Sequence, residues 1–129
     1  MEMRIPSPKE PITDAELELL KLLWGNGNAP LTAREMTEAL YGEPTTSTIG
    51  TVQKLIQRLE RKGCLRRDRR RYAHQFTARV SQSAVAGRQL EILAEKVADG
   101  SLAPFITHLV QAKRLSTRER NEIRRLLEE

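Results

Sequence analysis

One helix-start pattern precedes three apolar-periodic segments of this chain: a Ser or Thr followed three residues later by Glu. It begins at Thr13, Thr32 and Ser116. In such a capping box the hydroxyl accepts a hydrogen bond from the backbone N–H of the Glu, whose carboxylate accepts one from the backbone N–H of the Ser or Thr. Because apolar residues at helical spacing follow each box, the sequence predicts a mainly α-helical protein with helices that begin at these positions.

The first two predicted helices are short and amphipathic. The first runs from Thr13 to the glycines at positions 25 and 27, and its leucines recur every three residues beside Trp24. We expect Trp24 in the core, because large aromatic side chains usually fill protein interiors. The second runs from Thr32 to Gly42 and has the length of a first helix of a helix-turn-helix.

The third predicted helix, residues 47–62, is amphipathic in a different way. Its apolar stripe consists of Ile49, Val52, Leu55, Ile56 and Leu59. Its opposite face is polar near the start and basic later, and carries Thr51, Lys54, Arg58, Arg61 and Lys62. Short hydroxyl side chains can reach base edges in a DNA groove while Lys and Arg contact phosphates, so this profile suits insertion into a major groove.

A β-hairpin is predicted after Gly63, with one strand at 65–68 and the other at 72–76. Tyr72, His74 and Phe76 share one face of the second strand by the two-residue period. Arginines occupy positions 66, 67, 69, 70 and 71, and Asp68 is the only acid among them. We expect these arginines to lie along a phosphate backbone, which would neutralise them.

Charge is strongly segregated along the chain. Residues 1–44 carry four Lys and Arg against eight Asp and Glu, residues 45–79 carry ten against two, and residues 80–129 carry eight against seven. The middle third therefore has a net charge of +8, which indicates binding to a polyanion. A solvated basic face is the alternative that charge alone leaves open.

The last third is predicted to be helical throughout. One helix covers about 81–99 with Val85, Leu90, Leu93 and Val97 inward, a second opens at Ser101, and a third opens at Ser116. The apolar faces of the last two consist of Leu102, Phe105, Ile106, Leu109, Val110, Ile123, Leu126 and Leu127. Three thin helices cannot bury these residues among themselves, which favours a symmetric dimer. Packing against the first domain is the alternative.

These features predict a mainly α fold: a winged helix-turn-helix domain at 1–79 with a small β-hairpin wing, then a helical dimerisation domain at 80–129. Residues 1–11 are expected to be a flexible tail. The candidate DNA-binding residues are Thr46, Ser47, Thr48, Thr51, Lys54, Arg58, Arg67, Arg69, Arg70, Arg71 and Tyr72. The candidate dimerisation residues are the eight apolar residues of the last two helices.

Other function classes are disfavoured. The two histidines, His74 and His108, stand in no motif with a nucleophile, so we expect no enzyme. One cysteine, Cys64, and two separated histidines make a poor metal site, and we expect neither metal nor cofactor. No apolar run reaches 18 residues and no secretory signal is visible, so we expect a cytoplasmic protein without membrane spans.

The order of these parts resembles the penicillinase-repressor family of transcription factors. The stretch from Thr51 to Gly63 is similar to that family's recognition helix, whose pattern is Thr-Val, then Leu, then Arg-Leu, then Lys-Gly. Residues 12–17 with Trp24 are similar to its first helix. The C-terminal dimerisation arm is matched by Leu109, Val110, Leu115, Ser116 and Glu119. The resemblance covers nearly the whole chain from Ile12 onward.

The resemblance implies a homodimer that binds a palindromic double-stranded DNA operator and represses transcription, with an upstream sensor or protease as a further partner. Two family properties do not carry over directly. The family's cleaved Asn-Phe bond corresponds here to His108-Leu109, and no cysteine follows Cys64, although the copper-responsive branch has a Cys-rich tail.

Two alternatives remain within the same fold. One is a winged-helix regulator of another family that senses a small molecule. The other is a protein-interaction module, against which the +8 segment argues.

Overall fold

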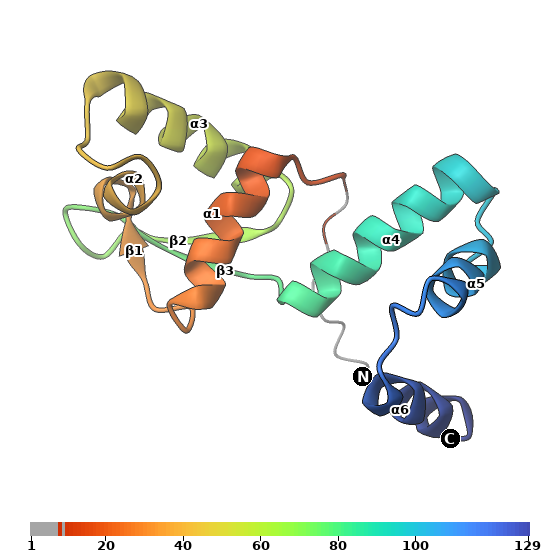
Figure 1. Cartoon of the computed structure of the whole chain (residues 1–129). Helices are drawn as coiled ribbons and strands as arrows, with labels where there is room; N and C mark the ends of the chain where they lie inside the picture. Colours follow the sequence, from red (N-terminus) through yellow and green to blue (C-terminus); the bar gives the residue numbers. More distant parts are fainter. Residues whose placement is uncertain (1–7, 9) are drawn as a thin grey trace, which may run out of the picture. The chain divides into compact units, whose positions relative to one another are not determined.

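The computed structural model describes residue 8 and residues 10–129 (Figure 1). The chain forms two compact units, Met1–Leu90 and Glu91–Glu129. The division falls within helix α4 (Gln82–Ala98), whereas the sequence prediction places the end of the DNA-binding domain at residue 79, ahead of this helix.

The first unit begins with α1 (Asp14–Gly25), α2 (Ala33–Tyr41) and α3 (Thr46–Arg61). The predicted capping boxes at Thr13 and Thr32 are both present, with the hydroxyl and the carboxylate each accepting a backbone N–H. A further box that the sequence pattern did not predict opens α3, where Thr45 pairs with Thr48. In Figure 1, α2 is seen nearly end-on while α3 runs across the view.

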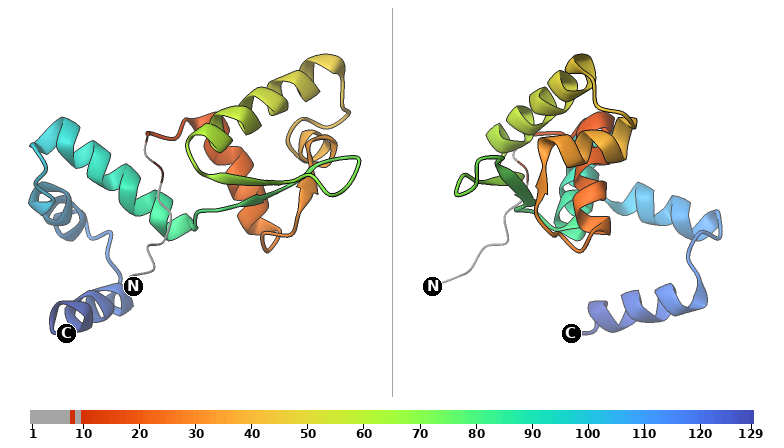
Figure 2. Two further views of the ribbon diagram at one scale, coloured as in Figure 1. Left: turned by 180° about the vertical axis from the view of Figure 1, so that it is seen from behind. Right: turned by 90° about the vertical axis from the view of Figure 1, so that its left-hand side faces the viewer.

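A small antiparallel sheet completes this unit. Strands β1 (Leu31–Thr32), β2 (Leu65–Asp68) and β3 (Gln75–Ala78) are arranged in the order β1-β3-β2. The loop between β2 and β3 projects from the body of the unit in both views of Figure 2. The three helices, of which α2 and α3 form the helix-turn-helix, and this hairpin confirm the predicted mainly α, winged-helix fold.

The second hairpin strand was predicted at 72–76, and this prediction is wrong. The strand is β3 at 75–78, where Asp68 pairs with Gln75 and Leu65 with Ala78. The two-residue period at 72, 74 and 76 was misleading because Tyr72 is fully exposed in the loop, and only Phe76 of the three is buried. The position of β3 depends also on β1, which pairs with it through Leu31 and Phe76 and which the sequence pattern did not predict.

One core is shared by the helices and the sheet of the first unit. Its members are Ile12, Leu19, Leu20, Leu23, Met36, Val52, Leu55, Ile56, Leu59, Cys64, Leu65, Phe76, Val80 and Val85. Four of the five residues predicted as the stripe of α3 are therefore buried, which fixes that helix by one face. Trp24 packs against the core as predicted, and its Nε1 donates to the carbonyl oxygen of Val80 at 3.0 Å.

Lys62 was predicted on the exposed basic face, and this prediction is also wrong. Its side chain is only 6% exposed, and Nζ donates to Glu16 Oε1 at 2.6 Å and to the carbonyl oxygen of Pro11 at 2.8 Å. Glu16 is completely buried, and its Oε2 has no hydrogen-bond partner among the described residues. The ammonium and the carboxylate thus join the end of α3 to the start of α1.

The second unit contains the end of α4, α5 (Ala103–Gln111) and α6 (Thr117–Leu127), with the predicted capping box at Ser116. Neither α5 nor α6 has a fully buried residue. Leu90, Leu93 and Val97 of α4 were predicted inward but are 41%, 45% and 67% exposed. Among the described helices, none is long and apolar enough to cross a bilayer.

Candidate nucleic-acid interface

The outer face of α3 is polar and basic because the opposite face is held in the core. Its exposed residues beyond the first turn are Thr51, Gln53, Lys54, Gln57, Arg58 and Arg61. Thr46 and Ser47 are exposed at the first turn. The only acid toward the end of this helix, Glu60, is partly covered. A solvent-facing helix of this composition is suited to a groove in DNA, where polar side chains meet base edges and cations meet phosphates.

Two of the predicted base-contacting hydroxyls are already used within α3. Thr51 Oγ1 donates to the carbonyl oxygen of Ser47 at 3.1 Å. Thr48 Oγ1 accepts from the backbone N–H of Thr45 at 2.8 Å as part of the cap that begins the helix. The hydroxyl hydrogen of Thr51 is therefore not free for a base, although its oxygen still has a lone pair to accept with.

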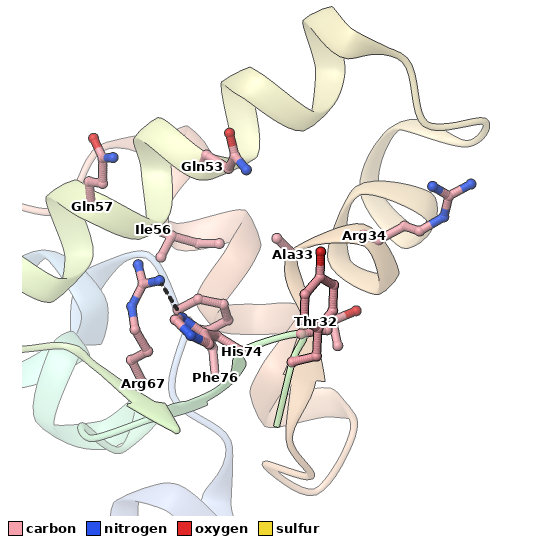
Figure 3. Close-up of a pocket in the computed structure, with 11 residues that line it drawn as sticks. Thr32, Ala33, Arg34, Gln53, Ile56, Gln57, Arg67, His74 and Phe76 are labelled. Carbon is pink, nitrogen blue, oxygen red and sulfur yellow. Dashed lines mark hydrogen bonds between the residues drawn. The ribbon is translucent and has the colours of Figure 1, made fainter. Parts of the chain in front are cut away.

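Two amide side chains on this face were not among the predicted site residues. Gln53 and Gln57 are both exposed, and their spacing of four residues places them on one side of α3 (Figure 3). Neither amide has a hydrogen-bond partner among the described residues. A glutamine amide can pair with the N6 and N7 edge of adenine through two hydrogen bonds. The sequence signal that identifies them is an amide pair at helical spacing, each member directly before a basic residue.

A pocket of about 530 Å³ lies where the helix-turn-helix meets the wing. It is lined from α2 and its cap by Thr32, Ala33 and Arg34, from α3 by Gln53, Ile56 and Gln57, and from the hairpin by Arg67, Tyr72, Ala73, His74 and Phe76. Figure 3 shows side chains from these three parts of the chain around it. The predicted recognition helix and the predicted wing are thus neighbours on one surface.

Most wing arginines are exposed at or near the tip, as expected for phosphate contacts. Arg69 and Arg71 have no carboxylate partner among the described residues, and Tyr72 beside them is fully exposed. Arg70 instead forms an ion pair with Asp68, Nη2 to Oδ2 at 2.7 Å. Hydrogen bonds from the side chain and the backbone of Arg70 hold the pKa of Asp68 far below its ordinary value. The tip therefore keeps an excess of positive charge.

Arg67 differs from its neighbours, since its side chain is only 23% exposed. Its Nε donates to Glu60 Oε2 at 3.0 Å and its Nη2 donates to Glu60 Oε1 at 2.7 Å. Nη1 lies 3.1 Å from His74 Nδ1, and the guanidinium carbon lies 4.7 Å from the centre of the Phe76 ring. The hydrogen bonds from Arg67 outweigh burial and lower the pKa of Glu60, so the pair stays charged.

Cys64 is buried in the core of the first unit, and His108 belongs to α5. Burial raises the pKa of the Cys64 thiol to about 11, so this cysteine is not a thiolate at neutral pH. His108 is exposed on α5. Within residue 8 and residues 10–129, no three His, Cys, Asp or Glu side chains are grouped so that they could hold a metal ion.

The predicted dimerisation residues form an apolar surface on the second unit. Leu102, Ile106, Leu109, Val110, Ile123, Leu126 and Leu127 are between 38% and 81% exposed, and Phe105 is partly buried. Between α5 and α6 lies a hollow of about 380 Å³, lined mainly by these side chains and bordered by Arg120 and Arg124. Exposed leucine, isoleucine and valine gathered in this way indicate a surface that another molecule covers.

Comparison with known proteins agrees with this geometry. A family model described as penicillinase repressor matches residues 12–129. The chain is also similar to a penicillinase repressor from Bacillus licheniformis, with 26% identity over 118 residues that cover 92% of this chain and 90% of that protein. The matched residues include the helix-turn-helix, the wing and all of the second unit. The chain therefore belongs to the penicillinase repressor family of DNA-binding transcriptional repressors.

Proposed function

We propose that the protein acts as a homodimer that recognises a palindromic operator by sequence and blocks transcription by occupying it. The observation that carries this proposal is the outer face of α3, where polar and basic side chains are exposed next to a wing with uncompensated arginines. The 16 residues of α3 make a rod that fits a major groove about 12 Å wide.

In this proposal each part of the surface has its own task. Thr46, Ser47, Gln53 and Gln57 face base edges, and Thr48 and Thr51 contribute acceptor oxygens near the start of the helix. Lys54 and Arg58 contact phosphates that border the groove. Arg69, Arg70, Arg71 and Tyr72 lie against the neighbouring backbone, so the wing adds affinity while α3 supplies sequence preference.

A second copy is proposed to cover the apolar surface of α5 and α6. A twofold axis would place two equal patches face to face and present two copies of α3 to DNA. Half-sites separated by about 34–36 Å, or one helical turn of DNA, then bind both subunits at once. Linking two weak contacts raises the affinity of the whole well above that of either half.

Selection of bound duplexes from random DNA by the full-length protein tests this function directly. The selected sequences should be inverted repeats with half-sites one helical turn, or a whole number of turns, apart. Enrichment of single half-sites, or no enrichment over the starting pool, would contradict the proposal of a dimer on a palindrome.

Replacing Gln53 with alanine should change which base is preferred at one position of each half-site. A bidentate amide–adenine pair contributes about 1–3 kcal/mol of discrimination, so preference at that position should fall by roughly 5-fold to 150-fold. Competition binding with operators substituted at single positions measures this. As a control, Arg58→Ala should weaken binding to all of these operators alike, because a phosphate contact has no base preference. A uniform loss for Gln53→Ala would remove it from the base-reading set.

Replacing both Arg69 and Arg71 with glutamine should flatten the salt dependence of DNA binding. Removing one phosphate interaction reduces the slope of log K against log salt by about 0.9, so removing both should reduce it by roughly 1.8. Titrations at salt concentrations from about 50 to 200 mM, on operator and random DNA, measure the slope. Lys21→Gln, an exposed cation on α1, is the control and should leave it unchanged. An unaltered slope in the double variant would exclude the wing tip from phosphate binding.

A further inference from the structure

Arg67 connects the wing to the recognition helix through contacts to both. From β2 its guanidinium reaches Glu60, in the last turn of α3, by two hydrogen bonds of 3.0 and 2.7 Å. On the other side of the hairpin it contacts His74 and lies over the ring of Phe76 (Figure 3). One side chain therefore joins three points: the end of α3, the start of β3 and the loop before it.

The partners of Arg67 leave it poorly placed to bind DNA. Its Nε, Nη1 and Nη2 groups all point to Glu60 or His74. The side chains of Glu60 and Arg67 are only 26% and 23% exposed. To reach a phosphate, Arg67 would have to leave Glu60 as a half-buried, unpaired anion beside a polyanion, which is unfavourable. Nη1 of Arg67 is also occupied, since it lies 3.1 Å from His74 Nδ1 and a guanidinium N–H can only donate.

The core fixes the base of the hairpin against α3 through Leu65 and Phe76, but the outer part of the wing has few other contacts with that helix. The ladder between β2 and β3 is four residues long, and the ion pair of Arg70 with Asp68 lies within the hairpin itself. The distal residues of the wing, 69 to 73, are all exposed. Among the described residues, the Arg67–Glu60 pair is thus the side-chain ion pair that orients the outer part of the hairpin against the recognition helix.

We propose that Arg67 is a positioning residue, which holds the wing so that its exposed arginines and α3 meet the same duplex. It acts through Glu60 and His74 and does not touch DNA. This proposal rests on the proposed function, and it gives Arg67 a different role from the phosphate contact that the arginine cluster predicts from sequence alone. A wing that is ordered before binding avoids part of the entropy cost of ordering it on DNA.

Two variants of the full-length protein separate the two roles by the sign and size of their effects on operator affinity. Glu60→Gln should weaken binding on the order of tenfold, because it loosens the wing, although it removes a negative charge from the DNA-facing surface. Arg67→Lys should weaken it similarly, since a lysine cannot form the two parallel hydrogen bonds or stack on Phe76 in the same way. If Arg67 instead binds phosphate, Glu60→Gln should strengthen binding and Arg67→Lys should retain nearly all of it.

Matched controls identify the source of each change. Glu43→Gln removes an exposed carboxylate just before α3 and should leave binding equal or slightly stronger. Arg69→Gln should flatten the salt slope by about 0.9, whereas Arg67→Lys keeps the charge and should change affinity without flattening the slope on random DNA. A gain of affinity for Glu60→Gln, or wild-type affinity for Arg67→Lys, would overturn the positioning role.

A measurement without DNA makes failure of this inference distinguishable from failure of the proposed function. Backbone ¹⁵N order parameters of residues 69–74 should fall in Glu60→Gln and in Arg67→Lys relative to the wild type, and should not change in Arg69→Gln. Unchanged order parameters in the first two variants would refute the positioning role, whether or not the protein binds an operator. Selected binding of DNA by the wild type tests the proposed function separately.

Discussion

Replacing Lys62 with methionine should destabilise the first unit by about 3–5 kcal/mol at neutral pH, because it leaves a buried anion without its partner. Glu16 is completely buried, and its carboxylate forms an ion pair with the ammonium of Lys62. Oε2 of Glu16 has no hydrogen-bond partner within the described residues, so the carboxylate would keep only its contact with the Thr13 cap. A urea titration of the full-length protein at one fixed protein concentration, followed by circular dichroism, measures the change in the free energy of unfolding.

A double variant provides the control for this prediction. Glu16→Gln keeps an amide oxygen that can accept the N–H of Thr13, as Glu16 Oε1 does at 3.0 Å. Combined with Lys62→Met it leaves no buried charge, and it should therefore recover most of the stability that Lys62→Met loses. If Lys62→Met alone stays within about 0.5 kcal/mol of the wild type, as surface substitutions do, the pair is not a major stabilising contact.

The same pair has a predictable pH dependence. Burial opposes ionisation of Glu16, but hydrogen bonds from Lys62 and Thr13 outweigh it and keep its pKa below the ordinary value. Stability from a depressed carboxyl pKa is complete above the unfolded value of about 4.3 and is lost as pH falls through the folded value. Wild-type stability should thus fall below about pH 4 more steeply than that of the double variant.

Replacing Ile106 with aspartate should abolish the proposed dimer and reduce affinity for the selected operator by about 10²–10⁴-fold, which is the gain that linking two binding sites can give. Ile106 is 57% exposed on the apolar surface of α5, so the single chain tolerates the charge while a buried interface would not. Sedimentation equilibrium measures the dimer, and fluorescence anisotropy with labelled operator measures the affinity. Phe105 is the less suitable position, because it is partly buried within its own chain.

Thr107→Asp is the control for this substitution. It places the same charge on the next residue of α5, which is exposed but is not among the residues that line the hollow. It should leave both the dimer and the affinity close to wild type. A persisting dimer in Ile106→Asp, with unchanged affinity, would refute α5 and α6 as the interface.

Local patterns were enough to predict most of the helical architecture. The capping boxes at Thr13, Thr32 and Ser116 mark helix starts to the residue, because each is made by side chains three residues apart. The stripe of α3 was predicted because the burial of one helical face requires a regular spacing. These interactions are contained within one element, so a single segment of sequence is sufficient to identify them.

The features that were missed depend on partners distant in the sequence. In the sequence Lys62 resembles the exposed cations of α3, but in the fold it binds Glu16, which lies 46 residues earlier. Strand β1 is two residues long and exists only because β3 pairs with it. Arg67 belongs by sequence to a run of arginines, but its side chain contacts Glu60 on α3 and the ring of Phe76. No local pattern encodes such contacts.

The Glu60–Arg67 pair also limits how this repressor can evolve. A single change at either position would leave the other charge largely buried and unpaired, which is unfavourable, whereas a joint change to two compatible residues avoids this cost. Positions 60 and 67 should consequently vary together across the family, with two compatible residues exchanged as a unit. Covariation of these two positions among related sequences would be the evolutionary signature of this ion pair.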